Sequence, residues 1–248
     1  MSGAVQIGHT ATLFDVPISR FDLESAVEEC VARIAKGSGG YACFVNVHSL
    51  TEATRQPALR ESLREATYCF ADGMPLVWLA RRQGAPIAGR VAGPDFMASL
   101  LARTRHLRHG FIGGATTTVA ERIAERFGIE AACYAPPMRE FSPAHARDDW
   151  ERFGEAPPIV WVGLGAPKQE LWMAEVARRA PGVMLFGVGA AFDVLAGMQP
   201  RAPQWMQARG LEWLYRLARE PRRLWPRYAA TNTRFAMRVV RDQLGMKK

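Results

Sequence analysis

Short apolar runs alternate with helical segments along most of this 248-residue chain. Most of the runs end at a glycine or a polar residue, which is how a buried strand leaves the core. The expected strands are 42–47, Tyr68–Ala71, 109–112, 129–134, 159–162 and 183–188. Strands that alternate with helices form a mostly parallel sheet whose two faces are covered by those helices. The sequence therefore predicts the α/β class.

Parallel strands place their carboxyl ends at one edge of the sheet, and α/β proteins bind ligands outside that edge. In a Rossmann-like sheet of this kind we expect the residues after the strands to converge on one cleft. These residues are Asn46, His48, Asp72, Gly113, Gly114, Gly163, Gly165, Lys168, Gln169 and Asp193.

The stretch 159–170, IVWVGLGAPKQE, is the most specific of these segments. An apolar strand, a glycine turn and a helix start present free backbone N–H groups to an anion. Lys168 and Gln169 would stand at the mouth of such a site. An ordinary strand-to-helix connection has the same pattern. The glycines complete neither a dinucleotide fingerprint nor a P-loop, and no metal-ligand cluster is apparent, so we expect no cofactor and no metal.

Three polar residues have two interpretations each. Asp72 precedes a glycine and is either a turn aspartate or a carboxylate that takes a proton from a hydroxyl nucleophile. Asn46 either caps a helix or hydrogen-bonds a polar ligand. Arg90 is either a surface residue or a clamp for an anion.

The net charge of +8 is concentrated at the C-terminus. Residues 209–248 contain eleven arginines or lysines and three acids, so they carry the whole excess. Arginine with Trp and Tyr is typical of a helix on an anionic membrane, although a solvated helix packed on the body is the alternative. We predict an α/β catalytic domain, 1–208, followed by a basic C-terminal helical appendage, 209–248.

The cysteines and the N-terminal residues indicate the cellular compartment in which the protein is expected. Cys30, Cys43, Cys69 and Cys133 are scattered without a C-x-x-C pair, which favours reduced thiols over a disulfide frame. The first residues lack a basic region followed by an apolar core, so we expect no signal peptide. Both observations favour the cytoplasm.

Several blocks of the sequence occur together in one known family. They are FVNVHSL, FADGMP, GRVAGPD, FIGG, VGLGAPKQE, FGVGAAFD, RAPQW and GLEWLYRL with EPRRLWPRY, and they cover about residues 40–230. With these blocks in order, the chain resembles the WecG/TagA/CpsF family of bacterial glycosyltransferases, which extend lipid-linked sugars for cell-surface polymers.

The resemblance implies a metal-independent, inverting transfer from a nucleotide-diphosphate sugar, such as UDP-N-acetylmannosamine or UDP-glucose. The acceptor would be a sugar on undecaprenyl diphosphate, reached from the cytoplasmic face of the plasma membrane. Asp72, expected to ionise with an ordinary pKa, matches the proposed general base, and Gln169 matches a residue at the substrate site. The matching tail arginines, thought to hold diphosphate, are Arg216, Arg223 and Arg227.

One position departs from the family pattern. The family often has threonine where this chain has Phe44, two residues before Asn46, so the donor need not be the N-acetylmannosamine type. The resemblance leaves open whether the chain forms a homo-oligomer.

Two other classes remain as alternatives. The basic tail also suits a nucleic-acid-binding α/β protein, which would show salt-sensitive binding to DNA or RNA and no binding of sugar nucleotides. A nicotinamide-dependent reductase is disfavoured by the incomplete glycine fingerprint.

Overall fold

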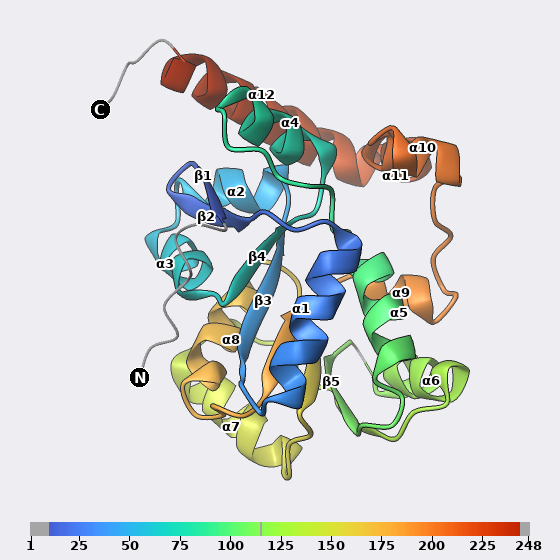
Figure 1. Ribbon diagram of the computed structural model, residues 1–248. Coiled ribbons are helices and arrows are strands. Elements are labelled where there is room, and N and C mark those ends of the chain that lie inside the picture. Colours follow the sequence, from blue (N-terminus) through green and yellow to red (C-terminus); the bar gives the residue numbers. More distant parts are fainter. Residues whose placement is uncertain (1–9, 115, 244–248) are drawn as a thin grey trace.

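A parallel six-stranded sheet forms the centre of the molecule (Figure 1). The structure is a computed structural model that describes residues 10–114 and 116–243. Across the sheet the strands follow the order β4-β3-β8-β7-β5-β6, and every neighbouring pair is parallel. The strands are β3 (Gly40–Val45), β4 (Tyr68–Ala71), β5 (His109–Gly113), β6 (Ala131–Tyr134), β7 (Ile159–Gly163) and β8 (Met184–Gly187). The predicted α/β class and parallel sheet are confirmed.

Helices cover both faces of this sheet, and further helices lie beyond the carboxyl ends of its strands. They are α1 (Leu23–Ala35), α2 (Val47–Ala53), α3 (Pro57–Glu65), α4 (Met74–Arg82), α5 (Gly93–Arg103), α6 (Thr118–Phe127), α7 (Pro143–Phe153), α8 (Lys168–Ala177), α9 (Ala191–Leu195), α10 (Gln204–Ala208), α11 (Glu212–Arg219) and α12 (Pro221–Gln243). One core contains buried side chains of α2, α3, α4, α7 and α8, and the other contains those of α1, α5, α6 and α9. Successive side chains of a strand point to opposite faces of the sheet and so enter different cores. Cys43 belongs to the first core and Phe44 to the second.

Local sequence signals set several helix ends. The Asp22 carboxylate accepts a hydrogen bond from the Ser25 backbone N–H at 3.0 Å, which caps α1. Ser142 caps α7, because its hydroxyl accepts a hydrogen bond from the His145 backbone N–H at 3.1 Å. The short helix α9 includes Asp193 and buries the neighbouring Phe192.

A small antiparallel hairpin, β1 (Thr10–Leu13) and β2 (Val16–Ser19), lies beside the sheet and supports the C-terminal helix. The rings of Phe14 and Phe235 are 5.5 Å apart, and the Arg238 guanidinium lies 5.6 Å from the Phe14 ring. The Arg234 guanidinium is 3.8 Å from the Glu52 carboxylate of α2. The long helix α12 is therefore packed on the body, as one interpretation of the basic tail required.

Figure 1 shows α4, α10, α11 and α12 grouped at one end of the molecule, beyond the carboxyl ends of the strands. Within residues 10–114 and 116–243, no helix combines the length and the apolar character that crossing a membrane requires.

Candidate active site

The carboxyl ends of neighbouring strands are aligned with each other at one edge of the sheet. Val45 pairs with Ala71, the residue before Asp72, and Gly113 pairs with Gly163 across β5 and β7. The residues that directly follow these strands consequently lie at one edge of the sheet. Asp72 and Gln169 share this edge but follow strands that are not neighbours, since β3 and β8 lie between β4 and β7.

Asp72 is held at the end of β4 by backbone hydrogen bonds. Its N–H donates to the Val45 carbonyl at 2.8 Å. The Val91 N–H donates to the Ala71 carbonyl at 2.9 Å, so the loop before α5 runs alongside this strand end. This second bond brings Arg90 into the neighbourhood of the Asp72 carboxylate.

Arg90 also reaches the C-terminal part of the chain. Its guanidinium lies 3.2 Å from the Glu212 carboxylate of α11 and 3.8 Å from the Asp95 carboxylate of α5. Arg201 forms a bidentate pair with Asp95 at 2.5 and 2.9 Å. Arg216 contacts Glu212 at 3.4 Å. We call the following residues the arginine–carboxylate cluster: Asp72, Arg90, Asp95, Arg201, Glu212 and Arg216.

Burial and the charges of the cluster together set the pKa of Asp72. Partial burial raises the pKa of this carboxyl from its ordinary 3.8 to about 6, with smaller upward contributions from Glu212 and Asp95. The positive charges of Arg90 and Arg216 oppose this rise. The ordinary pKa expected from the sequence is therefore wrong. A carboxylate with this raised pKa is mostly ionised at pH 7 and is a stronger base than a solvated aspartate.

Sequence reasoning did not single out Asp95, Arg201 and Glu212. Each lies in a block that carried the family resemblance: GRVAGPD, RAPQW and GLEWLYRL. The available signal was the presence of charged residues within those blocks. Only the fold shows that the three side chains meet.

Gln169 and Lys168 differ from expectation. Gln169 is only 6% exposed and lies beneath the edge of the sheet, where its amide nitrogen donates to the Gly187 carbonyl at 3.1 Å. The Lys168 ammonium donates to the Arg139 carbonyl at 2.9 Å, which ties it to the loop between β6 and α7. Neither side chain stands free at the mouth that the sequence suggested.

Asn46 caps α2, which is the first of the two interpretations that its sequence position allowed. Its side-chain oxygen accepts hydrogen bonds from the backbone N–H groups of His48 and Ser49 at 3.0 and 3.1 Å. The Asp193 carboxylate is at the start of α9 and accepts a long hydrogen bond of 3.5 Å from Gln199.

The glycines at the strand ends have two different roles. A Cβ on Gly113 would lie 2.4 Å from the Gly163 carbonyl oxygen, and a Cβ on Gly163 would lie 2.8 Å from the Phe192 ring. These two glycines permit close packing. Gly114 and Gly165 adopt positive φ angles of 81° and 76° in the turns that follow, and open space surrounds the Cβ position of Gly165.

Of the three tail arginines, Arg216 is the one whose side chain the structure describes. Arg216 belongs to the arginine–carboxylate cluster. Arg223 and Arg227 lie on α12, but their side chains are outside the described part of the structure. Phe44 is buried against Phe70 and Phe96 in the second core, with ring centroids 5.5 and 5.2 Å away.

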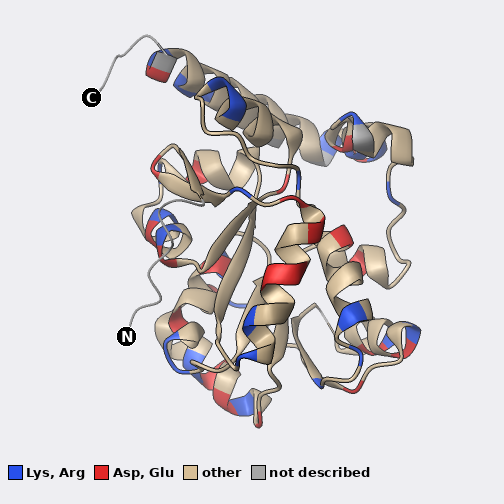
Figure 2. Cartoon of the chain, in the orientation of Figure 1, with Lys and Arg blue, Asp and Glu red and all other residues tan. Residues whose placement is uncertain are grey.

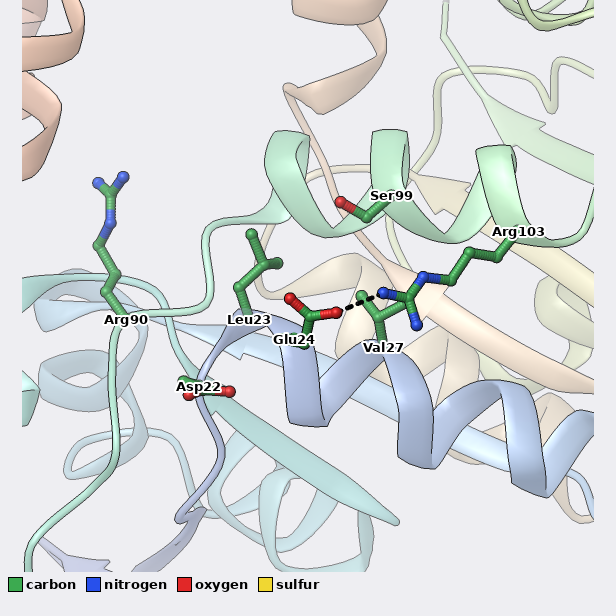
Figure 3. A pocket seen from close by; sticks show the side chains of 7 residues that line it. All are labelled: Asp22, Leu23, Glu24, Val27, Arg90, Ser99 and Arg103. Carbon is green, nitrogen blue, oxygen red and sulfur yellow. Dashed lines mark hydrogen bonds and ion pairs between the residues drawn. The ribbon is translucent and has the colours of Figure 1, made fainter.

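A pocket of about 380 Å³ lies close by, between α1 and α5. Arg90 is among its lining residues, but Figure 3 shows the Arg90 guanidinium extending away from the other six. The lining Glu24 and Arg103 are paired with each other at 2.7 Å. This pocket is therefore separate from the carboxylate of Asp72. Among the described residues, no group of three or more His, Cys, Asp or Glu side chains could hold a metal ion.

A parallel α/β sheet with an aspartate and several arginines at its carboxyl edge has the charges that could bind a phosphorylated ligand. The sequence matches the glycosyl transferase WecG/TagA/CpsF family over residues 11–248, which is nearly the whole chain. The chain belongs to this family of glycosyltransferases, whose members act in cell-surface polymer biosynthesis. The resemblance seen in the sequence is confirmed.

Proposed function

We propose that this enzyme is an inverting hexosyltransferase that uses a UDP-sugar donor, such as UDP-N-acetylmannosamine or UDP-glucose. The acceptor is a hydroxyl of a sugar carried on undecaprenyl diphosphate. The observation that carries the proposal is the arginine–carboxylate cluster, which puts one base with a raised pKa next to several arginines at the ligand-binding edge of the sheet.

The residues have complementary roles in the proposed reaction. The Asp72 carboxylate takes the proton of the acceptor hydroxyl as its oxygen bonds to the anomeric carbon. The bond from that carbon to the diphosphate breaks on the opposite face, and the UDP leaves with the bonding electrons. Arg90, Arg201 and Arg216 would stabilise the negative charge on the departing diphosphate.

The C-terminal appendage supports a membrane-bound acceptor. Exposed tryptophans lie on α4, α10, α11 and α12: Trp78, Trp205, Trp213 and Trp225. Arginines lie in the same C-terminal helices, and Figure 2 shows basic residues on α11 and α12. Interfacial tryptophan combined with arginine favours a surface of anionic lipid, so we place the enzyme on the cytoplasmic face of the plasma membrane.

The catalytic assignment is tested with Asp72→Asn. Release of UDP from a panel of UDP-sugars would be measured with a polyprenyl-diphosphate-linked sugar as acceptor. We expect a loss of at least about a hundredfold in kcat, because the proton acceptor is gone. Asp148→Asn, on the exposed surface of α7, is the matched control and should retain activity. Turnover of Asp72→Asn near that of the unmodified enzyme would reject the assignment of the base.

Membrane binding is tested with Trp213→Ala combined with Trp225→Ala. We expect the unmodified protein to float with vesicles of phosphatidylglycerol and not with vesicles of phosphatidylcholine, and the double variant to float less.

A nucleic-acid-binding function would instead give salt-sensitive binding of oligonucleotides and no thermal stabilisation by any UDP-sugar.

A further inference from the structure

Glu212 lies at the centre of the arginine–carboxylate cluster. One of its carboxylate oxygens is 3.2 Å from the Arg90 guanidinium. The other oxygen is 3.4 Å from the Arg216 guanidinium and 3.9 Å from that of Arg201. These arginines come from three different segments: the loop before α5, the loop before α10, and α11 itself. A single carboxylate therefore bridges three guanidinium groups.

The Glu212 carboxylate has little contact with water. Its side chain is 14% exposed, and that of Arg90 is 16% exposed. Solvent screens charges weakly at such a site, so the ion pair is stronger there than on an open surface. When all the cluster residues are ionised, three arginines face three carboxylates. The arginines that would hold a diphosphate are thus already neutralised within the chain.

The two carboxylates that pair with these arginines are held by very different elements. Asp95 belongs to α5, where the adjacent Phe96 and Met97 are fully buried in the second core. Glu212 is the first residue of α11, and none of the eight residues of that helix is buried. The core fixes Asp95 in place, whereas α11 has no such anchor. Of the two carboxylates, Glu212 can leave the arginines with less disturbance of the core.

We propose that Glu212 is a resident counter-ion that occupies the place of the ligand's diphosphate among the arginines and is displaced when a sugar nucleotide binds. The inference rests on the proposed function, which assigns these arginines to the diphosphate. Carboxylate and phosphate oxygens accept the same charge-assisted hydrogen bonds from guanidinium groups, so they compete for the same donors. Only molecules in which Glu212 has left the arginines bind the ligand, so the contact is autoinhibitory and lowers the apparent affinity. When UDP leaves, Glu212 returns to the arginines.

Two other roles for Glu212 give different results when its charge is removed. If Glu212 orients Arg90 for the ligand, its removal weakens binding, because a positioned guanidinium binds better than a mobile one. If Glu212 only repels the ligand through its charge, its removal strengthens binding whether or not Arg90 is present. The sign of the effect and its dependence on Arg90 therefore separate the three accounts.

The first measurement is the affinity of the whole chain for UDP, determined by titration calorimetry. We expect Glu212→Gln to bind UDP about tenfold more tightly than the unmodified protein, because glutamine keeps the size of the side chain without its charge. Glu212→Ala should change the affinity in the same direction, since it also removes the competing carboxylate. Uridine, which lacks the diphosphate, should gain nothing from either substitution.

Glu175→Gln is the matched control. The Glu175 side chain is also 14% exposed, and it lies 2.7 to 3.9 Å from three arginines. It is near the C-terminal end of α8, away from the carboxyl edge of the sheet where that helix begins. The affinity of this variant for UDP should stay within about twofold of the unmodified value, because distant sites act independently.

The second measurement repeats the comparison in an Arg90→Gln background. Arg90 is the nearest of the three arginines to Glu212, so Glu212 competes less strongly once this partner is missing. The gain from Glu212→Gln should then shrink from about tenfold to about threefold or less.

Equal or weaker binding of UDP by Glu212→Gln would overturn the inference and leave the proposed function standing. A gain that is undiminished in the Arg90→Gln background would also overturn it, because the charge would then act at a distance and not by occupying Arg90. An equal gain for uridine would do the same. If neither the unmodified protein nor Glu212→Gln binds UDP, the proposed function fails together with the inference.

Discussion

Asp72→Asn should make the protein more stable at neutral pH while it removes activity. Burial raises the pKa of the native Asp72 carboxyl from 3.8 to about 6. The native state therefore binds this proton more tightly than the unfolded chain does. The resulting stability is fully present below pH 3.8 and is lost as the pH rises through 6. Asparagine is neutral throughout, so its advantage grows with pH.

The size of the effect follows from the shift in pKa. Two pKa units correspond to about 3 kcal/mol in the free energy of unfolding, which is an upper limit because Asp72 keeps part of its surface in water. With that solvent screening we expect Asp72→Asn to gain about 1–2 kcal/mol at pH 7.5 and about half of that at pH 5.

Urea unfolding at the two pH values measures this difference, with Asp148→Asn as the control for a surface aspartate. A variant less stable than the unmodified protein at pH 7.5 would refute the reasoning. So would a gain in stability that is the same at both pH values, since it could not come from the ionisation of Asp72.

Two further predictions concern the same edge of the sheet. Arg90→Gln removes a positive charge that lowers the pKa of Asp72, so the acidic limb of the pH profile of kcat/KM should move to higher pH by about one unit. Glu212→Gln removes a negative charge and should move this limb to lower pH. Shifts in the same direction for both variants would contradict the electrostatic account. Gly113→Ala should lower the free energy of unfolding by about 2–4 kcal/mol, because Gly113 has a φ of 132° and the new methyl would meet the backbone of β7. A loss below about 1 kcal/mol in urea unfolding would show that the strand ends separate more easily than the structure indicates.

The edge of the sheet could be predicted from sequence because strand ends are local signals. Asp72, Gly113 and Gly163 each follow an apolar run, and parallel pairing places such residues at one level. The same reasoning could not decide how each side chain is used. Asn46 turned out to cap α2, and Gln169 turned out to be buried. Both outcomes depend on neighbours that only the folded chain supplies.

The sequence by itself determined the class of fold, the family and the residue that we assign as the base, because periodicity and short motifs are properties of adjacent residues. The tertiary structure alone decided the arginine–carboxylate cluster. Arg90 and Glu212 are 122 positions apart, and no local pattern predicts that they meet. Their pairing results from the way α12 packs against the hairpin and α2 while α11 lies beyond the strand ends. That packing also sets the pKa of Asp72, which is a property of the whole site and of no single segment.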